Sequence, residues 1–407
     1  MYNTDFKPCL RFMVVSDIHI KDEHSVERER FEKAIRDAYA IAKSNKHYQK
    51  LDVIGMVGDF ATYGTPTQFK AARDIVDANV DLDETTVIAS IASHEFMNEG
   101  VEAAYKNFRE IFGGEPDTHA VVNGFHFVSI TPSKGCNYDD DKKEWMAKEL
   151  NEAAKDGRKK PIFVFQHPHN TGTVYGSTLW GEDDLIPIYM NYPQIIHFSG
   201  HSHAPINDPR SIHQQHFTCL GTGTLSYFEL DEFDKIYSTI PTNKEQAAQM
   251  LIVEVDEENR VRIYPYDVLT GNFFPYVWEI DTPSDPSTFK YTGERYKTTA
   301  APFFAEDAEV AISAVTENSF RVDFPQANPA ECDKYVNSYD IIVKNADSEI
   351  IRQLSIWSEY YFYDMPATLG VDVSDLDSDS DYTVEIRANS FWMTSSKENI
   401  KATVHTK

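Results

Sequence analysis

Histidine and aspartate residues follow five apolar segments in the first half of this 407-residue sequence. In chain order, the segments end in Asp17-Ile18-His19, Gly58-Asp59, Ser93-His94-Glu95, His167-Pro168-His169 and Gly200-His201-Ser202-His203. Imidazole and carboxylate are ligands that Zn, Mn and Fe prefer in proteins. One such motif is commonplace, because Gly-Asp is frequent in turns and alternate residues of any strand point the same way. Five in succession, each after an apolar segment, predict a shared metal site.

The elements that must position these side chains are the strands of an α/β domain. Short apolar runs predict strands at residues 10–15, 51–57, 86–91, 125–130, 161–165 and 195–198. Apolar residues at helical spacing predict helices at 31–42, 68–78 and 101–111. Alternating runs at 250–255 and 260–266 predict an antiparallel hairpin, so mixed sheets covered by helices are expected. Because sites in open α/β sheets form beyond the carboxyl ends of the strands, the five motifs are expected to meet at one edge.

The order of these motifs resembles that of the calcineurin-like metallophosphoesterase superfamily. The pattern of that family is D-x-H, G-D, G-N-H-D/E, a single His and G-H-x-H, and the resemblance covers residues 10–270. It implies a four-layer α/β/β/α sandwich with a binuclear metal centre. The metals implied are two divalent ions, with Mn, Fe or Zn favoured by the nitrogen and oxygen ligands and Mg as a further candidate.

The resemblance also implies a role for each matching residue. The implied ligands of the first ion are Asp17, His19 and His203. Those of the second ion are Ser93, His167 and His201, and Asp59 is implied to bridge the two ions. His94 is implied to be the catalytic residue beside the substrate, where it could protonate the leaving oxygen or stabilise charge on the phosphoryl group. A capping or packing histidine is the alternative for His94.

Two positions depart from the family pattern. Ser93 stands where the family has an asparagine that binds the second metal, and Ala92 stands in place of the preceding glycine. A serine hydroxyl is shorter and a weaker donor than an amide oxygen, so a weaker second site or an altered metal preference is expected. In the fourth motif, His167 follows the strand directly and is the preferred ligand, with His169 as the fallback.

The expected function is hydrolysis of phosphomonoesters or phosphodiesters by a metal-activated water or hydroxide, on a small phosphoester substrate. The alternative is a degenerate family member that acts as a binding or scaffold protein, in which Ser93 is the difference that removes activity. A nuclease is disfavoured, because 65 Asp and Glu against 38 Lys and Arg give a formal charge of -27, which repels nucleic acid.

Several features of the sequence bear on the cellular location of the protein and on the state of its cysteines. No run of about 18 apolar residues predicts a membrane helix, and residues 1–11 lack a signal-peptide pattern, which favours the cytoplasm. The four cysteines, Cys9, Cys136, Cys219 and Cys332, lack the spacing of a zinc knuckle or disulfide framework and are expected to be free thiols. His197, in an apolar run, is predicted to be a core histidine with satisfied hydrogen bonds. The oligomeric state stays open.

The C-terminal part of the sequence has a different character. Residues 1–280 are assigned to the metallophosphoesterase domain, residues 281–302 to a Pro- and Ser-containing linker, and residues 303–407 to a β-sandwich of short strands. Leu376 and Tyr382 resemble the tyrosine corner of fibronectin type III domains, in which the tyrosine hydroxyl bonds to the backbone upstream. An aromatic cluster at 357–363 favours packing over a sugar- or partner-binding face.

Overall fold

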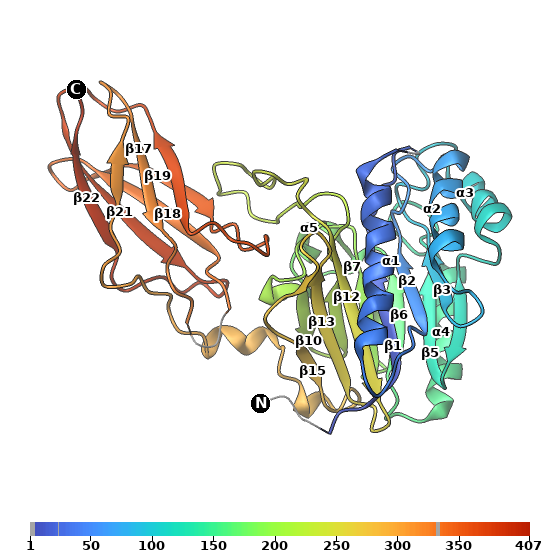
Figure 1. Ribbon diagram of the computed structural model, residues 1–407. Coiled ribbons are helices and arrows are strands. Elements are labelled where there is room, and N and C mark those ends of the chain that lie inside the picture. The colour runs from blue at the N-terminus through green and yellow to red at the C-terminus, as the bar shows by residue number, and fades with distance from the viewer. Residues whose placement is uncertain (1–4, 23, 331–333) are drawn as a thin grey trace. The chain divides into compact units, whose positions relative to one another are not determined.

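The computed structural model describes residues 5–22, 24–330 and 334–407 (Figure 1). The chain divides into two compact units, which are described separately. The first comprises Met1–Asp231 and Asn243–Gly293, and the second comprises Glu232–Thr242 and Glu294–Lys407. The segment Glu232–Thr242, named the strap below, therefore belongs with the C-terminal residues although it lies between two parts of the first unit in the sequence. None of the described helices is long and apolar enough to cross a membrane.

The first unit contains a seven-stranded sheet with the order β14-β13-β12-β1-β2-β3, in which β15 also pairs with β13. In that order, the strands are β14 (Asn272–Phe273), β13 (Val261–Asp267), β12 (Gln249–Asp256), β1 (Pro8–Val15), β2 (Val53–Val57), β3 (Thr86–Ser90) and β15 (Trp278–Ile280). β1, β2 and β3 are parallel, whereas β12 is antiparallel to both β1 and β13. The predicted hairpin is thus confirmed, and the first three motifs leave the same edge of the sheet.

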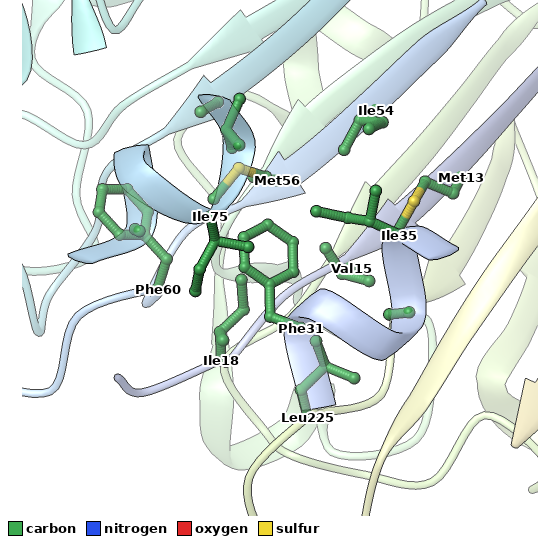
Figure 2. Close-up of a cluster of buried hydrophobic side chains, with 14 of the residues drawn as sticks. Met13, Val15, Ile18, Phe31, Ile35, Ile54, Met56, Phe60, Ile75 and Leu225 are labelled. Atoms are coloured by element: carbon green, nitrogen blue, oxygen red, sulfur yellow. The ribbon is translucent and has the colours of Figure 1, made fainter. Parts of the chain in front are cut away.

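Helices cover one face of this sheet because their apolar residues recur on one side. They are α1 (Val26–Ser44), α2 (Pro66–Asn79) and α3 (Val101–Asn107), the last continued by a π-helical turn at Phe108–Phe112. Phe31 and Ile35 of α1 pack with Met13 and Val15 of β1 in a buried cluster (Figure 2). α2 begins at Pro66 after Thr65, whose hydroxyl accepts a hydrogen bond from the backbone N–H of Gln68.

A six-stranded sheet forms the rest of the first unit, with the order β10-β11-β9-β6-β5-β4. These strands are β10 (Ile212–Gln214), β11 (Thr218–Gly221), β9 (Ile195–Ser199), β6 (Ile162–Gln166), β5 (Phe125–Ile130) and β4 (Thr118–Val122). The remaining elements of this part are helices α4 (Asp140–Ala153), α5 (Ser177–Trp180) and α6 (Ile186–Tyr189), and the paired strands β7 (His169–Asn170) and β8 (Gly181–Glu182). Met146 and Leu150 of α4 pack against this sheet through Val128 and Val164.

The two sheets meet through aromatic side chains. Phe12 of β1 points away from the helices, and its ring centroid lies 5.2 Å from that of Phe127 and 4.7 Å from that of Phe163. A Cβ atom at Gly55 of β2 would approach the ring of Phe165 to 2.6 Å, so glycine permits this contact between the sheets. The mixed sheets predicted from the sequence are confirmed, but β4, β10, β11 and α4 are absent from the predictions.

The second unit is built almost entirely from strands. Its two sheets have the orders β16-β17-β20 and β19-β18-β21-β22. The strands are β16 (Ala311–Ser313), β17 (Phe320–Pro325), β20 (Thr368–Val373), β19 (Ile350–Trp357), β18 (Ser338–Lys344), β21 (Asp381–Asn389) and β22 (Ile400–His405). Alternate residues of β17 are buried, which is the pattern of a strand with one face on a core.

Two local contacts of this unit bear on the sequence analysis. The backbone N–H of Asp377 donates to the hydroxyl of Tyr382 at 2.9 Å, which is the tyrosine-to-backbone contact predicted for this turn. In the strap, the backbone N–H of Ile236 donates to the carbonyl of Ser355 at 3.0 Å. Because β19 is the edge strand of its sheet, this bond gives a partner to one backbone carbonyl on the edge that faces no other strand of the sheet.

Two further predictions concern buried side chains. His197 is fully buried, but neither ring nitrogen has a hydrogen-bond partner in the described part of the chain, so the prediction of satisfied hydrogen bonds is wrong. Burial lowers the pKa of His197 to about 3 and keeps the ring neutral among Tyr189 and Phe217. Cys9, Cys136 and Cys219 are free, as predicted, whereas Cys332 lies outside the described residues.

Candidate metal centre

The predicted site residues come from the edges of two sheets rather than one. Asp17 and His19 follow β1, Asp59 follows β2, and Ser93 and His94 follow β3 of the first sheet. The residues that follow β6 and β9 of the second sheet are His167, His201 and His203. The expectation of a single sheet edge is therefore corrected: two edges lie together because the sheets pack face to face.

The backbone at this site is left-handed at five of these residues, which is rare for residues other than glycine. They are Asp17 (φ 51°), His19 (φ 54°), Asp59 (φ 52°), His201 (φ 75°) and His203 (φ 55°). Each such conformation costs about 1–3 kcal/mol and persists only where surrounding bonds hold it. Here the N–H of His19 donates to the carbonyl of Asp59 at 3.0 Å, so the loops after β1 and β2 hold each other.

One group of potential ligands consists of Asp17, His19 and His203. One ligand atom from each lies within 4.8 Å of the others, and all three residues are buried. Nε2 of His203 is 3.4 Å from Oδ1 of Asp17 and 3.0 Å from Nε2 of His19. The arrangement offers two nitrogens and one oxygen to a small common volume.

A second group consists of Asp59, His167 and His201, again with ligand atoms within 4.8 Å of one another. Asp59 also belongs to a third such group, with His19 and His94. Nε2 of His167 lies 2.9 Å from Oδ2 of Asp59 and 3.8 Å from Oδ1 of Asp17. The two carboxylates therefore join the first and second groups into one continuous cluster.

Backbone carbonyls fix the histidine rings in this cluster. Nδ1 of His167 donates to the carbonyl of Val57 at 2.7 Å, and Nδ1 of His203 donates to the carbonyl of Tyr227 at 2.9 Å. Because a carbonyl oxygen only accepts, Nδ1 carries a proton in each ring, and whenever the ring is neutral Nε2 has a lone pair directed elsewhere. Such bonds orient metal-binding histidines and raise their basicity.

Electrostatics favours neutral rings at three of these positions. Burial lowers the pKa of His19 and of His201 to about 3, and that of His203 to about 4. Burial also disfavours protonation of His167, but the nearby carboxylates of Asp59 and Asp17 outweigh it and raise its pKa to about 10. His19, His201 and His203 thus offer lone pairs, while His167 sits where positive charge is most strongly stabilised.

The environment of His167 tests whether a metal fits the site. Its Nε2 is buried and makes no hydrogen bond within the described part of the chain, although Oδ2 of Asp59 is only 2.9 Å away. Two donor atoms that face each other in this way are satisfied by a shared cation, and nitrogen and carboxylate oxygen together suit Mn, Fe or Zn. The residues present therefore fit a divalent metal.

Glu95 is a site residue to which the sequence analysis gave no role. Its buried carboxylate accepts hydrogen bonds from the backbone N–H groups of Asp59 at 3.0 Å, Ala61 at 2.8 Å and Ala92 at 2.8 Å. Burial, together with the charge of Asp59, raises the pKa of Glu95 to about 8. The side chain joins the loops after β2 and β3 and so positions Asp59. Glu95 occupies the D/E position of the third motif, and this position could have identified it as a site residue from the sequence.

The loop after β3 also places Ser93 and His94 beside Asp59. Oγ of Ser93 lies 3.4 Å from Oδ2 of Asp59, and the backbone N–H of His94 donates to Oδ1 of the same carboxylate at 3.0 Å. Nδ1 of His94 donates to the carbonyl of Thr62 at 2.8 Å, which anchors the half-buried ring. Ser93 thus lies next to the carboxylate of Asp59, and a ring nitrogen of His94 lies within 4.8 Å of ligand atoms of Asp59 and His19.

The fallback ligand His169 lies in a different environment. Its Nδ1 is 2.7 Å from the hydroxyl of Ser199, and its Nε2 is 2.7 Å from the hydroxyl of Ser202. Both nitrogens are thus occupied by side chains around β9 and the loop that follows it. The structure brings His167, and not His169, to the cluster of potential ligands.

Three half-buried residues that the sequence analysis did not connect with the site surround its histidines. The ring of Tyr227 lies 4.1 Å from that of His203, and the ring of Trp180 lies 5.1 Å from that of His201, nearly at right angles. Sγ of Cys136 is 3.3 Å from Nε2 of His201. All three lie in or beside loops without a regular pattern, so no signal in the sequence pointed to them.

The chain is similar in sequence to one known protein family. Residues 10–205 match the family described as Calcineurin-like phosphoesterase. A comparison with curated protein sequences gave no match.

Among solved structures, purple acid phosphatase PPD1 from yellow lupin (Lupinus luteus) seeds is 12% identical, with 67% of this chain and 53% of that chain covered and a TM-score of 0.46. The fn3 domain of the human collagen alpha-1(XX) chain is 16% identical, with 27% of this chain and 87% of that chain covered and a TM-score of 0.20. Domains d3-d4 of the rat CD45 extracellular region are 16% identical, with 26% of this chain and 50% of that chain covered and a TM-score of 0.19. These structural likenesses are distant.

Proposed function

We propose that the protein hydrolyses phosphomonoesters or phosphodiesters with two divalent metal ions, and the match of residues 10–205 to the family described as Calcineurin-like phosphoesterase supports this. The observation that carries this proposal is the pair of three-residue groups, Asp17/His19/His203 and Asp59/His167/His201, joined through their carboxylates. Mn, Fe or Zn suit these ligands, and Mg is a further candidate.

The proposed ligand assignment follows the two groups. Asp17, His19 and His203 would hold the first ion, and His167 and His201 would hold the second, with Asp59 as the bridge. Ser93 is proposed as a weak or water-mediated ligand of the second ion, since its hydroxyl touches the bridge. The chemistry that such ions supply when bound is polarisation of a phosphoryl group and activation of water as a nucleophile.

The residues of the chain contribute orientation and proton transfer. The backbone N–H of His201 donates to both oxygens of Asp17, each at 3.1 Å, and the N–H of His94 donates to Asp59. These bonds hold both carboxylates before substrate arrives. The imidazole of His94, anchored to Thr62 through Nδ1, is proposed to hand a proton to the leaving oxygen from its other nitrogen.

The alternative function, a binding or scaffold protein without turnover, rests on the substitution of asparagine by Ser93. Both functions predict metal binding, and only the first predicts hydrolysis. Elemental analysis of protein purified without chelator, followed by assays of aryl phosphomonoesters and phosphodiesters with each added metal, separates them. Hydrolysis that needs added metal supports the enzyme. Bound metal without turnover of any ester supports the scaffold, and absence of metal uptake overturns both.

Variants connect the assay to the site. We expect His94→Ala to lower kcat by about 100-fold, within the range for a general acid or base, with metal content unchanged. His216→Ala serves as the matched control, because His216 is exposed on the same unit. Equal turnover in the two variants would remove His94 from the reaction.

The finer architecture is proposed on the same basis. We propose that the first unit is the four-layer α/β/β/α sandwich of the family, since helices and the opposed faces of two sheets follow that pattern. We further propose domains at 1–280 and 303–407 with a linker at 281–302, and a fibronectin III-like topology for the second, supported by the contact between Tyr382 and Asp377. A small phosphoester, and no nucleic acid, is the proposed partner in view of the charge of -27.

A further inference from the structure

A cavity in the second unit lies where the strap meets the end of β19. Its volume is about 110 Å³, which is below the range of about 300–1,000 Å³ that is usual for pockets that enclose drug-sized molecules, so only part of one small ring can enter it. The lining residues used below are Tyr237 and Thr242 of the strap, and Trp357, Glu359, Tyr361 and Thr368 of the sandwich. All of them belong to the second unit, so the cavity is a feature of that unit alone.

Glu359 brings a negative charge into this cavity. The side chain is half-buried, and it forms no ion pair with a lysine or arginine of the described chain. The hydroxyl of Thr242 donates to Oε1 at 3.2 Å, and burial raises the pKa of the carboxyl group. The backbone of Glu359 is left-handed (φ 62°), a conformation that costs free energy and is concentrated at binding sites. The carboxylate retains acceptor capacity for a ligand.

Trp357 contributes the opposite kind of polar group. The side chain is only 2% exposed, and its Nε1–H has no hydrogen-bond partner among the described residues. A buried N–H without an acceptor is destabilising, so buried indoles normally find an acceptor. Trp357 and Glu359 line the same cavity, so one side chain with an unpartnered N–H donor and one with a carboxylate acceptor border the same space.

Aromatic and aliphatic residues form the remaining wall. Tyr361 is buried, and Tyr237 is 38% exposed at the mouth, where Thr368 adds an exposed hydroxyl. Aromatic faces with a few convergent polar groups are typical of sites that bind a ligand with one apolar face and a polar edge.

We propose that this cavity binds a neutral polyhydroxylated ring, that is, a sugar unit. A cation would pair with Glu359 but leave the N–H of Trp357 unmatched, and an anion would be repelled by Glu359 and by the net charge of -27. A hydroxyl group both donates and accepts, so adjacent hydroxyls satisfy both residues at once. The apolar face of the ring then lies against Tyr237.

The indole signal of Trp357 tests this site in the full-length protein. The chain has five tryptophans, so a protein labelled with ¹⁵N-tryptophan gives few indole N–H resonances, and Trp357→Phe identifies the relevant one. The probes are methyl glycosides of glucose, galactose, N-acetylglucosamine and xylose, with glycerol and tetramethylammonium chloride as comparison ligands. We expect a saturable shift of the Trp357 signal with at least one glycoside and none with the comparison ligands.

Variants decide whether the binding uses the proposed groups. Glu359→Gln and Tyr237→Ala should each weaken the glycoside by about tenfold, since one charge-assisted bond or one ring contact is lost. Tyr296→Ala is the matched control, because Tyr296 is an exposed tyrosine (52%) of the same unit outside the cavity. No shift with any glycoside, a shift produced equally by glycerol, or an affinity for the glycoside that Glu359→Gln leaves unchanged would each overturn the proposal.

Discussion

Replacing Gly200 by alanine should damage the first group of ligands through a single added methyl group. Gly200 directly follows β9, and its φ lies outside the left-handed region, so the backbone itself accepts alanine. The new Cβ, however, would lie 2.3 Å from Oδ2 of Asp17 and 2.5 Å from Oγ of Ser16. The perturbation is therefore a local steric displacement of one carboxylate.

The size of that displacement decides its consequence. Ordinary contact with a Cβ atom begins at 3.4 Å, so the carboxylate of Asp17 must move by roughly 1 Å if it alone gives way. Metal–ligand distances are held to about 0.2 Å, so Asp17 could not stay in the ligand set. We expect affinity for the first metal to fall by about 10–100-fold, as for loss of a positioning interaction, with an overpacking cost of about 1–3 kcal/mol.

Gly221→Ala provides the matched control for this experiment. Gly221 ends β11, pairs with Ser199 of β9, and also has a φ that alanine tolerates. The nearest atoms to its added Cβ are 3.8–3.9 Å away, which is ordinary contact. Mn titration of the metal-free protein, followed by metal analysis and urea unfolding, compares the two variants. If Gly200→Ala binds Mn as tightly as Gly221→Ala, the steric argument and the role of Asp17 are both refuted.

Three further expectations concern other parts of the molecule. Ser93→Asn should raise Mn affinity by about 10–100-fold, because an amide oxygen reaches further than the hydroxyl; saturation of both proteins at the same Mn concentration would contradict this. Hydrogen bonds from Lys344 and Asn399 lower the pKa of Glu385 from 4.5 to about 2. The ionised carboxylate therefore stabilises the folded state fully above pH 4.5, and this stabilisation is lost as the pH falls toward 2. The stability difference between wild type and Glu385→Gln, measured by urea unfolding of the second unit, should shrink over that interval, and a constant difference would argue against the assignment. Residues 303–407 expressed alone should give a β-rich circular dichroism spectrum and a cooperative melt, although at a lower midpoint than in the full chain, because the strap is missing; a disordered fragment would count against an independent domain.

The order of the motifs in the sequence was sufficient to predict the class of fold and the residues that gather. Asp17, Asp59 and His167 each follow an apolar strand, and such strands are readable because their side chains are buried on both faces. The contact of Tyr382 with the backbone of Asp377 was predictable because it is local, since Tyr382 is five positions after Asp377. Short-range pattern is what a single sequence records well.

Long-range packing decided the rest. The sequence could not show that His167 and His201 reach the other ligands from a second sheet, because that meeting depends on contacts such as Phe12 with Phe163, far apart in the chain. Nor could it show that Glu95 accepts hydrogen bonds from three backbone N–H groups, or that the strap closes a cavity in the second unit. Residue types and spacing determine which side chains are available as ligands. The packing of the two sheets, and the left-handed loops held between them, determine which of these side chains share one centre.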